Sequence, residues 1–169
     1  MSNIITSPNY IGLTTEPIIF LAGPIQSAKD WQSVAVAYIS KKLFPTKYVA
    51  SPRRNIKFTG EFGTEMYNEQ VDWETYHLRH AGKFGVILFW LAKESVHDPK
   101  RAYAQTTRFE LAEWKMRYEH DNIKLVIGIE EGFTGAKYIR RRLSQDCPNI
   151  KICSTLEETC DQALVLLNN

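Results

Sequence analysis

The chain has 169 residues, of which 44% are hydrophobic and 24% charged, and its formal net charge is +2. This length and composition are typical of one globular domain with a proper core. The net charge is too small to argue for nucleic acid by itself, and no nucleic-acid polymer is expected as partner. No apolar stretch approaches the roughly 20 residues that span a membrane. Three cysteines without metal or redox spacing favour reduced thiols in the cytoplasm.

The chain divides into an N-terminal arm and a single domain. Residues 1–16 are polar and lack a clear periodicity, so we expect an irregular arm ahead of a domain at 17–169. Short apolar runs predict strands at 17–22, 47–51, 84–91, 125–129 and 150–153. Helices are predicted from a cap at Ser27 or Asp30 to about 43, then at 69–80, from about 106 to 120, at 135–144 and at 156–167.

Strands that alternate with helices predict a parallel sheet with helices on both faces. Five strands in this length fit a flavodoxin-like, doubly wound order. The 84–91 run is apolar on both faces, so we expect it to be central. The polar segment 53–63 is predicted to be a long loop, and long loops in compact domains are often functional.

Ligands in such sheets bind outside the carboxyl ends of the strands. Four predicted connections converge there, and they contain Gly23-Pro24-Ile25, Ser51-Pro52-Arg53-Arg54-Asn55, the segment 90–107, and Glu130-Glu131-Gly132-Phe133. We therefore look for chemistry at this edge. No Walker-type or Gly-x-Gly-x-x-Gly loop is present, so no nucleotide cofactor is expected.

Glu110 is the first candidate, because it follows the central strand and lies in the first turns of the next predicted helix. The positive end of the helix dipole is expected to keep it ionised. An ionised carboxylate beside a cleft suits a nucleophile in glycosyl transfer. The alternative is an acid that stabilises its own helix.

Other side chains add to this edge, each with a simpler alternative. Glu74 offers a second acid, with Asp72 competing in the same turn, and either residue also suits a solvated helix face. Arg53 and its neighbour Arg54 suit an anion or a charged loop. Trp90 and Phe133 suit stacking on a planar base or core packing. The series Glu74, His77 and His80 lacks a complete ligand set, so no metal is expected.

Several segments together resemble the nucleoside 2-deoxyribosyltransferase-like proteins over roughly residues 17–145. The segments are Ile19-Phe20-Leu21-Ala22-Gly23-Pro24-Ile25, Ser51-Pro52-Arg53-Arg54, Gln70-Val71-Asp72-Trp73-Glu74, Ile87-Leu88-Phe89-Trp90, Arg108-Phe109-Glu110-Leu111-Ala112-Glu113-Trp114, Val126-Ile127-Gly128-Ile129 and Gly132-Phe133. Their order and spacing carry the resemblance.

The resemblance implies a flavodoxin-like fold and transfer of a 2-deoxyribosyl group between nucleobases by double displacement. It assigns the nucleophile to Glu110, an acid that contacts the deoxyribose to Glu74, and the turn lining the pocket to Gly23-Pro24-Ile25. It also implies a homo-oligomer with sites near subunit interfaces. Better-known members have an aspartate shortly before the nucleophile, where this chain has Tyr103-Ala104-Gln105, so Gln105 is expected to offer a neutral amide to the base. A tyrosine near their first strand has no match at Ile19 or Phe20.

The sequence thus predicts a cytoplasmic nucleoside deoxyribosyltransferase of nucleoside salvage. Two alternatives stay open. One is a nucleoside 5′-monophosphate N-glycosidase that holds phosphate through Arg53 and Arg54. The other is a non-catalytic nucleoside or nucleotide sensor that keeps the pocket.

Overall fold

The computed structural model describes residues 3–42, 47–54 and 63–169. A parallel sheet of six strands forms its centre, in the order β1-β3-β2-β4-β5-β6. The strands are β1 (Asn3–Thr6), β2 (Ile18–Ala22), β3 (Tyr48–Ser51), β4 (Val86–Leu91), β5 (Leu125–Ile129) and β6 (Ile152–Cys153). The predicted flavodoxin-like α/β class is confirmed, but the predicted number of five strands is one too low.

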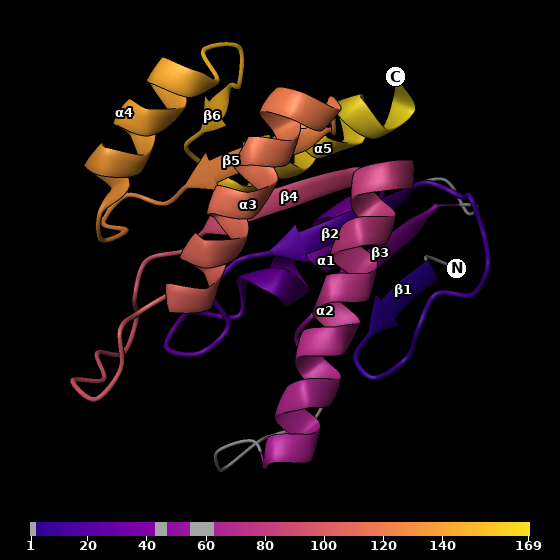
Figure 1. Ribbon diagram of the computed structural model, residues 1–169, viewed down its shortest axis with the longest axis horizontal. Helices are drawn as coiled ribbons and strands as arrows, with labels where there is room; N and C mark the ends of the chain where they lie inside the picture. Colours follow the sequence, from indigo (N-terminus) through magenta and orange to yellow (C-terminus); the bar gives the residue numbers. More distant parts are fainter. Residues whose placement is uncertain (1–2, 43–46, 55–62) are drawn as a thin grey trace.

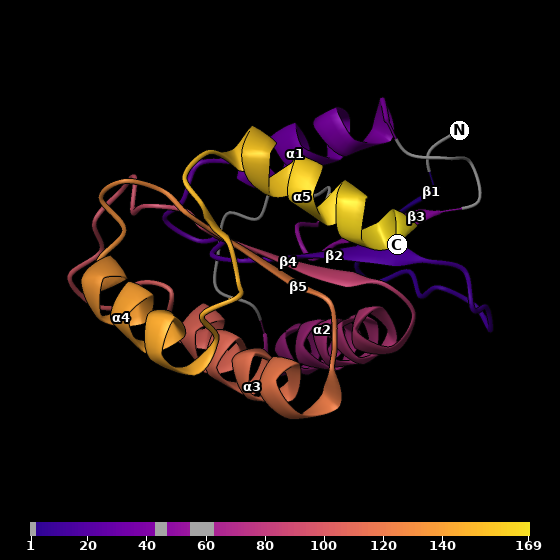
Figure 2. The same cartoon turned by 90° about the horizontal axis from the view of Figure 1, so that it is seen from above.

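Helices cover both faces of the sheet (Figures 1 and 2). They are α1 (Trp31–Ser40), α2 (Thr64–Phe84), α3 (Gln105–Asp121), α4 (Ala136–Asp146) and α5 (Leu156–Asn168). Figure 2 shows α1 and α5 on one face and α2, α3 and α4 on the other. No helix in the described part of the chain is long and apolar enough to cross a membrane.

The central strands are buried along their whole length because helices cover both of their faces. Residues of β4 alternate between two cores. Ile87, Phe89 and Leu91 face the α2–α3 side, and Val86, Leu88 and Trp90 face the α1–α5 side. Since β4 pairs with both β2 and β5, its predicted central position is confirmed.

The N-terminal segment belongs to the sheet, contrary to the prediction of an irregular arm. Residues 3–6 form β1, which pairs in parallel with β3 at the sheet edge. The following residues are fastened to α2: Trp73 Nε1 donates to the Asn9 carbonyl at 2.6 Å, and Tyr76 donates to the Ile11 carbonyl at 3.1 Å. Four residues at an edge give too short a pattern to predict, and tertiary pairing supplies their order.

Element boundaries differ from the predictions for local reasons. Asp30, not Ser27, caps α1, because its Oδ1 accepts from the Ser33 N–H at 3.1 Å. Phe84 ends α2 instead of beginning β4, and Gly85 then passes so close to the Ile18 backbone that a Cβ has no room. Helix α2 begins before the predicted residue 69. Most of the predicted loop 53–63 and the predicted helix end near 43 lie outside the described residues.

Candidate active site

The candidate site lies beside the carboxyl ends of β2, β3 and β4, on the sheet face covered by α2 and α3. These two helices run side by side (Figures 1 and 2). Helix α2 contributes Glu74 and α3 contributes Glu110, and both side chains are partly buried. The charge of Glu74 raises the pKa of Glu110, so the two carboxylates are near enough to interact. The structure therefore brings together the two acids that the sequence singled out.

The pKa of Glu110 is raised to about 8, mainly by burial and also by the nearby carboxylates of Glu74 and Glu113. The expectation that the helix dipole keeps Glu110 ionised is therefore wrong for the free protein. Because α3 begins at Gln105, Glu110 lies in its second turn, and the dipole acts mainly within the first. Burial and like charge outweigh the dipole here.

A chain of hydrogen bonds fixes Glu74. Its Oε1 accepts from the Gln70 amide at 2.7 Å, and the same amide nitrogen donates to the Pro52 carbonyl at 2.9 Å. Arg54 Nε donates to Gln70 Oε1 at 2.8 Å, and its Nη2 pairs with Glu69 at 2.5 Å. Burial raises the pKa of Glu74, while the Gln70 donor and the Arg54 charge oppose that rise. Glu74 is thus tied to the end of β3.

The turn after β2 is held rigidly against the end of the sheet. Gly23 has φ +154°, and a Cβ there would lie 2.7 Å from Trp31 Cζ2 and still closer to the Trp90 carbonyl oxygen. The Pro24 carbonyl accepts from Trp31 Nε1 at 2.8 Å and from Gln32 Nε2 at 3.4 Å. Glycine is required at this position by both its φ and its surroundings.

Arg53 joins this turn to the end of β3. Its Nε pairs with Asp30 Oδ1 at 2.9 Å and donates to Gln32 Oε1 at 3.0 Å, and its Nη2 donates to the Ile25 carbonyl at 3.2 Å. Gln32 is completely buried. The Nε and Nη2 groups of Arg53 are thus already bonded to the protein, so an incoming phosphate must compete with these partners.

The two aromatic candidates lie on opposite sides of the sheet. Trp90 is 5% exposed in the core that also contains Trp31, on the face away from Glu110. Phe133 is 4% exposed on the face of Glu110. Its ring lies 6.1 Å from that of Tyr103 and 4.5 Å from the Arg108 guanidinium carbon. The core-packing alternative describes both rings in this conformation.

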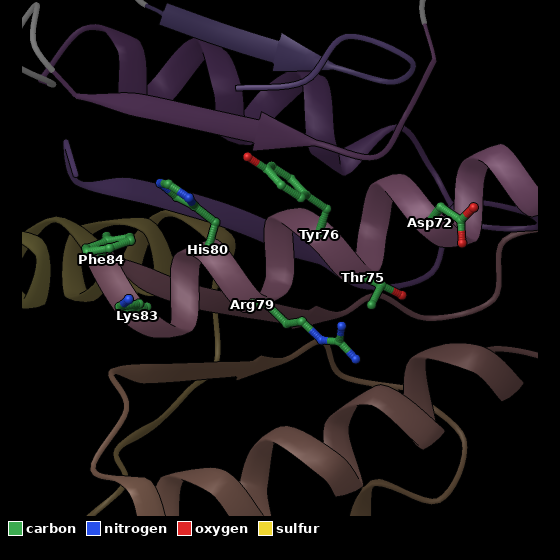
Figure 3. Close-up of a pocket in the computed structure, with 7 residues that line it drawn as sticks. All are labelled: Asp72, Thr75, Tyr76, Arg79, His80, Lys83 and Phe84. Atoms are coloured by element: carbon green, nitrogen blue, oxygen red, sulfur yellow. The ribbon is translucent and has the colours of Figure 1, made fainter. Parts of the chain in front are cut away.

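Asp72 points to the outer side of α2. It lines an open groove whose side chains Figure 3 shows along the helix, namely Asp72, Thr75, Tyr76, Arg79, His80, Lys83 and Phe84. Of the two competing acids, Glu74 is therefore the one that faces the site. Gln105 is exposed at the first position of α3.

Sequence reasoning missed three contributors. Gln70 holds Glu74, and its i, i+4 spacing to that acid was a usable signal. Tyr103 donates to the Ala92 carbonyl at 2.6 Å, and burial raises the pKa of its hydroxyl. Arg108 donates to the Thr134 carbonyl at 2.5 Å and so fastens the loop after β5 to α3. These two long-range contacts have no signal in the sequence.

His77, from the series Glu74, His77 and His80, is held by contacts within the protein. The buried His77 accepts from the Ile11 N–H at 3.2 Å and contacts the Trp73 carbonyl at 2.8 Å. Within the ranges that the structure describes, no three His, Cys, Asp or Glu side chains gather in a way that could hold a metal ion. In comparisons with known proteins, no family model and no curated protein sequence matches this chain.

Proposed function

We propose that the protein is a nucleoside 2-deoxyribosyltransferase that exchanges nucleobases on 2′-deoxyribose. The observation that carries the proposal is the pair of interacting, partly buried carboxylates, Glu74 on α2 and Glu110 on α3. A site of this kind at the carboxyl ends of parallel strands is where such folds bind ligands. The proposed enzyme works in the cytoplasm in nucleoside salvage.

In the proposed reaction Glu110 acts as nucleophile. The ionised form of its carboxylate, which a pKa near 8 makes the minor form at neutral pH, attacks C1′ of the deoxynucleoside. The C1′–N bond breaks as the base leaves with the bonding electrons and takes a proton from water. The product is a deoxyribosyl ester on Glu110. A nitrogen of a second base then attacks C1′ and loses its proton to water, the ester C–O bond breaks, and the carboxylate is released. Two inversions give net retention.

The neighbouring residues have supporting roles in this proposal. Glu74 orients the sugar, and the turn Gly23-Pro24-Ile25 lines the pocket. In this proposal Gln105 offers its amide and Phe133 its ring to the base. A carboxylate whose pKa lies near 8 is also a stronger base, and hence a better nucleophile, than an ordinary glutamate.

Base exchange in solution tests the proposal. Wild-type protein is incubated with panels of deoxynucleosides and free bases, and products are separated by chromatography. We expect exchange to be lost in Glu110→Ala, by at least about 10³-fold, because no nucleophile remains. The matched control is Asp121→Asn at the far end of the same helix, an exposed residue paired with Arg117 at 3.9 Å. Near-normal exchange in folded Glu110→Ala would exclude Glu110 as nucleophile.

The same panel decides between the proposal and its two alternatives. A strict requirement for a 5′-phosphate, with free base and sugar phosphate as products, would identify an N-glycosidase instead. That reading depends on Arg53 and Arg54, which already bind Asp30 and Glu69. Ligand binding without turnover for any acceptor would identify a sensor.

A further inference from the structure

Gln70 is the most constrained polar side chain around Glu74. It is 8% exposed on α2, one turn before Glu74. Its amide makes three hydrogen bonds, in which Oε1 accepts from Arg54 and Nε2 donates to both the Pro52 carbonyl and Glu74 Oε1. Both hydrogens of the Gln70 amide and its single oxygen thus take part in hydrogen bonds.

These partners allow one orientation of the amide. A rotation by half a turn would set Nε2 against the Arg54 donor and Oε1 against the Pro52 carbonyl and Glu74. All three hydrogen bonds would be lost in a buried place, where unpaired polar groups are costly. Arg54 and Pro52 therefore fix the Gln70 amide, and the amide in turn presents an N–H to Glu74 Oε1.

We propose, on the basis of the function proposed above, that Gln70 is a positioning residue that occupies Oε1 of Glu74 and leaves Oε2 to accept a hydrogen bond from a sugar hydroxyl of the substrate. With one oxygen held on the protein, the carboxylate has a fixed plane and a single acceptor for the ligand. Preorganised acceptors of this kind position a substrate without reorganisation during the reaction.

The charges that face this arrangement come from two sides. Arg54, after β3, and the Gln70 donor both favour the ionised form of Glu74. From α3, Glu110 faces Glu74, with Glu113 one turn further along. Keeping Glu74 ionised raises the pKa of Glu110, so the Gln70 amide acts on both carboxylates. Glu69 binds Arg54 from the exposed side of α2.

Replacing Gln70 tests this role through kinetics. In Gln70→Met, which keeps the length of the side chain but has no donor, we expect kcat/KM to fall about 10- to 100-fold. The acidic limb of its pH profile should also move, because losing the Gln70 donor raises the pKa of Glu74 and so changes the charge that Glu110 faces. Glu69→Gln, which alters the Arg54 pair but leaves Gln70 in place, should retain the wild-type limb. An unmoved limb in folded Gln70→Met overturns the proposal.

A titration without substrate separates this proposal from the proposed function. Carbon-13 NMR follows the Glu74 carboxyl, assigned with Glu74→Gln, in wild type, Gln70→Met and Gln70→Glu. The pKa of Glu74 should rise in both variants, since one removes the donor and the other places a second carboxylate there. It should not rise in Glu69→Gln. Should the wild type exchange no base, the proposed function fails, and this titration still shows whether Gln70 holds Glu74. An unchanged Glu74 titration in both Gln70 variants overturns the role.

Discussion

At the scale of single residues, the main feature of the candidate site is that burial raises the pKa of Glu110. Its side chain lies in the second turn of α3, where it interacts with Glu74, and its pKa is about 8. The folded protein therefore binds a proton at Glu110 more tightly than the unfolded chain, in which the ordinary value is 4.5. The contribution of Glu110 to the free energy of unfolding therefore falls as the pH rises from about 4.5 through about 8, and Glu110 is fully destabilising above that range.

Replacing Glu110 by glutamine should remove this penalty. We expect Glu110→Gln to be more stable than wild type by roughly 1–3 kcal/mol above the folded pKa, and nearly equal to it at a pH close to 4.5. Denaturant unfolding of both proteins at the two ends of this range measures the difference. A variant that is no more stable at high pH than at low pH would contradict the burial of the Glu110 charge.

The positions of the two acids were predictable, but their electrostatics were not. Glu110 follows the central strand in sequence, and the parallel topology then places it near Glu74. The raised pKa of Glu110 and the orientation of Gln70 depend on side chains from β3, α2 and α3 that meet only in the folded chain. Trp90 shows the same limit, because its position in sequence did not reveal which face of the sheet it occupies.

At the scale of elements, the turn after β2 organises the site. Gly23 lies against Trp31 and the Trp90 backbone, so the turn joins β2, α1 and β4. We expect Gly23→Ala to cost about 1–3 kcal/mol of unfolding free energy, because its φ and its close neighbours both disfavour a Cβ. Gly12→Ala is the matched control, since nothing lies within 4 Å of its Cβ position. Equal unfolding midpoints in denaturant for the two variants would contradict this role.

Long apolar runs made most elements predictable. The runs that became β2, β4 and β5 are buried on both faces and gave clear signals. The first turn of α2 is mostly exposed, so it lacks the apolar periodicity of a buried helix face. The strand β1 was missed because its order comes from pairing with β3 rather than from its own four residues.

At the scale of the whole molecule, we propose that the outer side of α2 binds a second copy of the chain. The exposed side chains Glu65 and Asp72 make the first half of this helix acidic, where Glu69 is already paired with Arg54, while Arg79 and Lys83 make the second half basic. Tyr76, which is 38% exposed, lies between the two halves (Figure 3). An antiparallel α2 from a second copy would set each acidic half against a basic half, as a two-fold interface requires.

Charge reversal tests this interface. Arg79→Asp should weaken self-association at least about tenfold, because it sets like charges against each other. The double variant Asp72→Arg/Arg79→Asp should recover association, since the opposite charges are restored in exchanged positions. Sedimentation equilibrium at several concentrations measures both. A wild type that stays monomeric throughout, or an Arg79→Asp variant that associates normally, would rule out this surface.

The proposed reaction requires that Glu110 becomes covalently bound to the sugar. Acid quenching of the protein with excess deoxynucleoside, followed by mass spectrometry of its peptides, measures this most directly. We predict a deoxyribosyl adduct on Glu110 that is absent from Glu110→Gln and disappears when a free base is added before the quench. Base exchange that proceeds in Glu110→Gln, or an adduct located on another residue, would exclude Glu110 as the nucleophile.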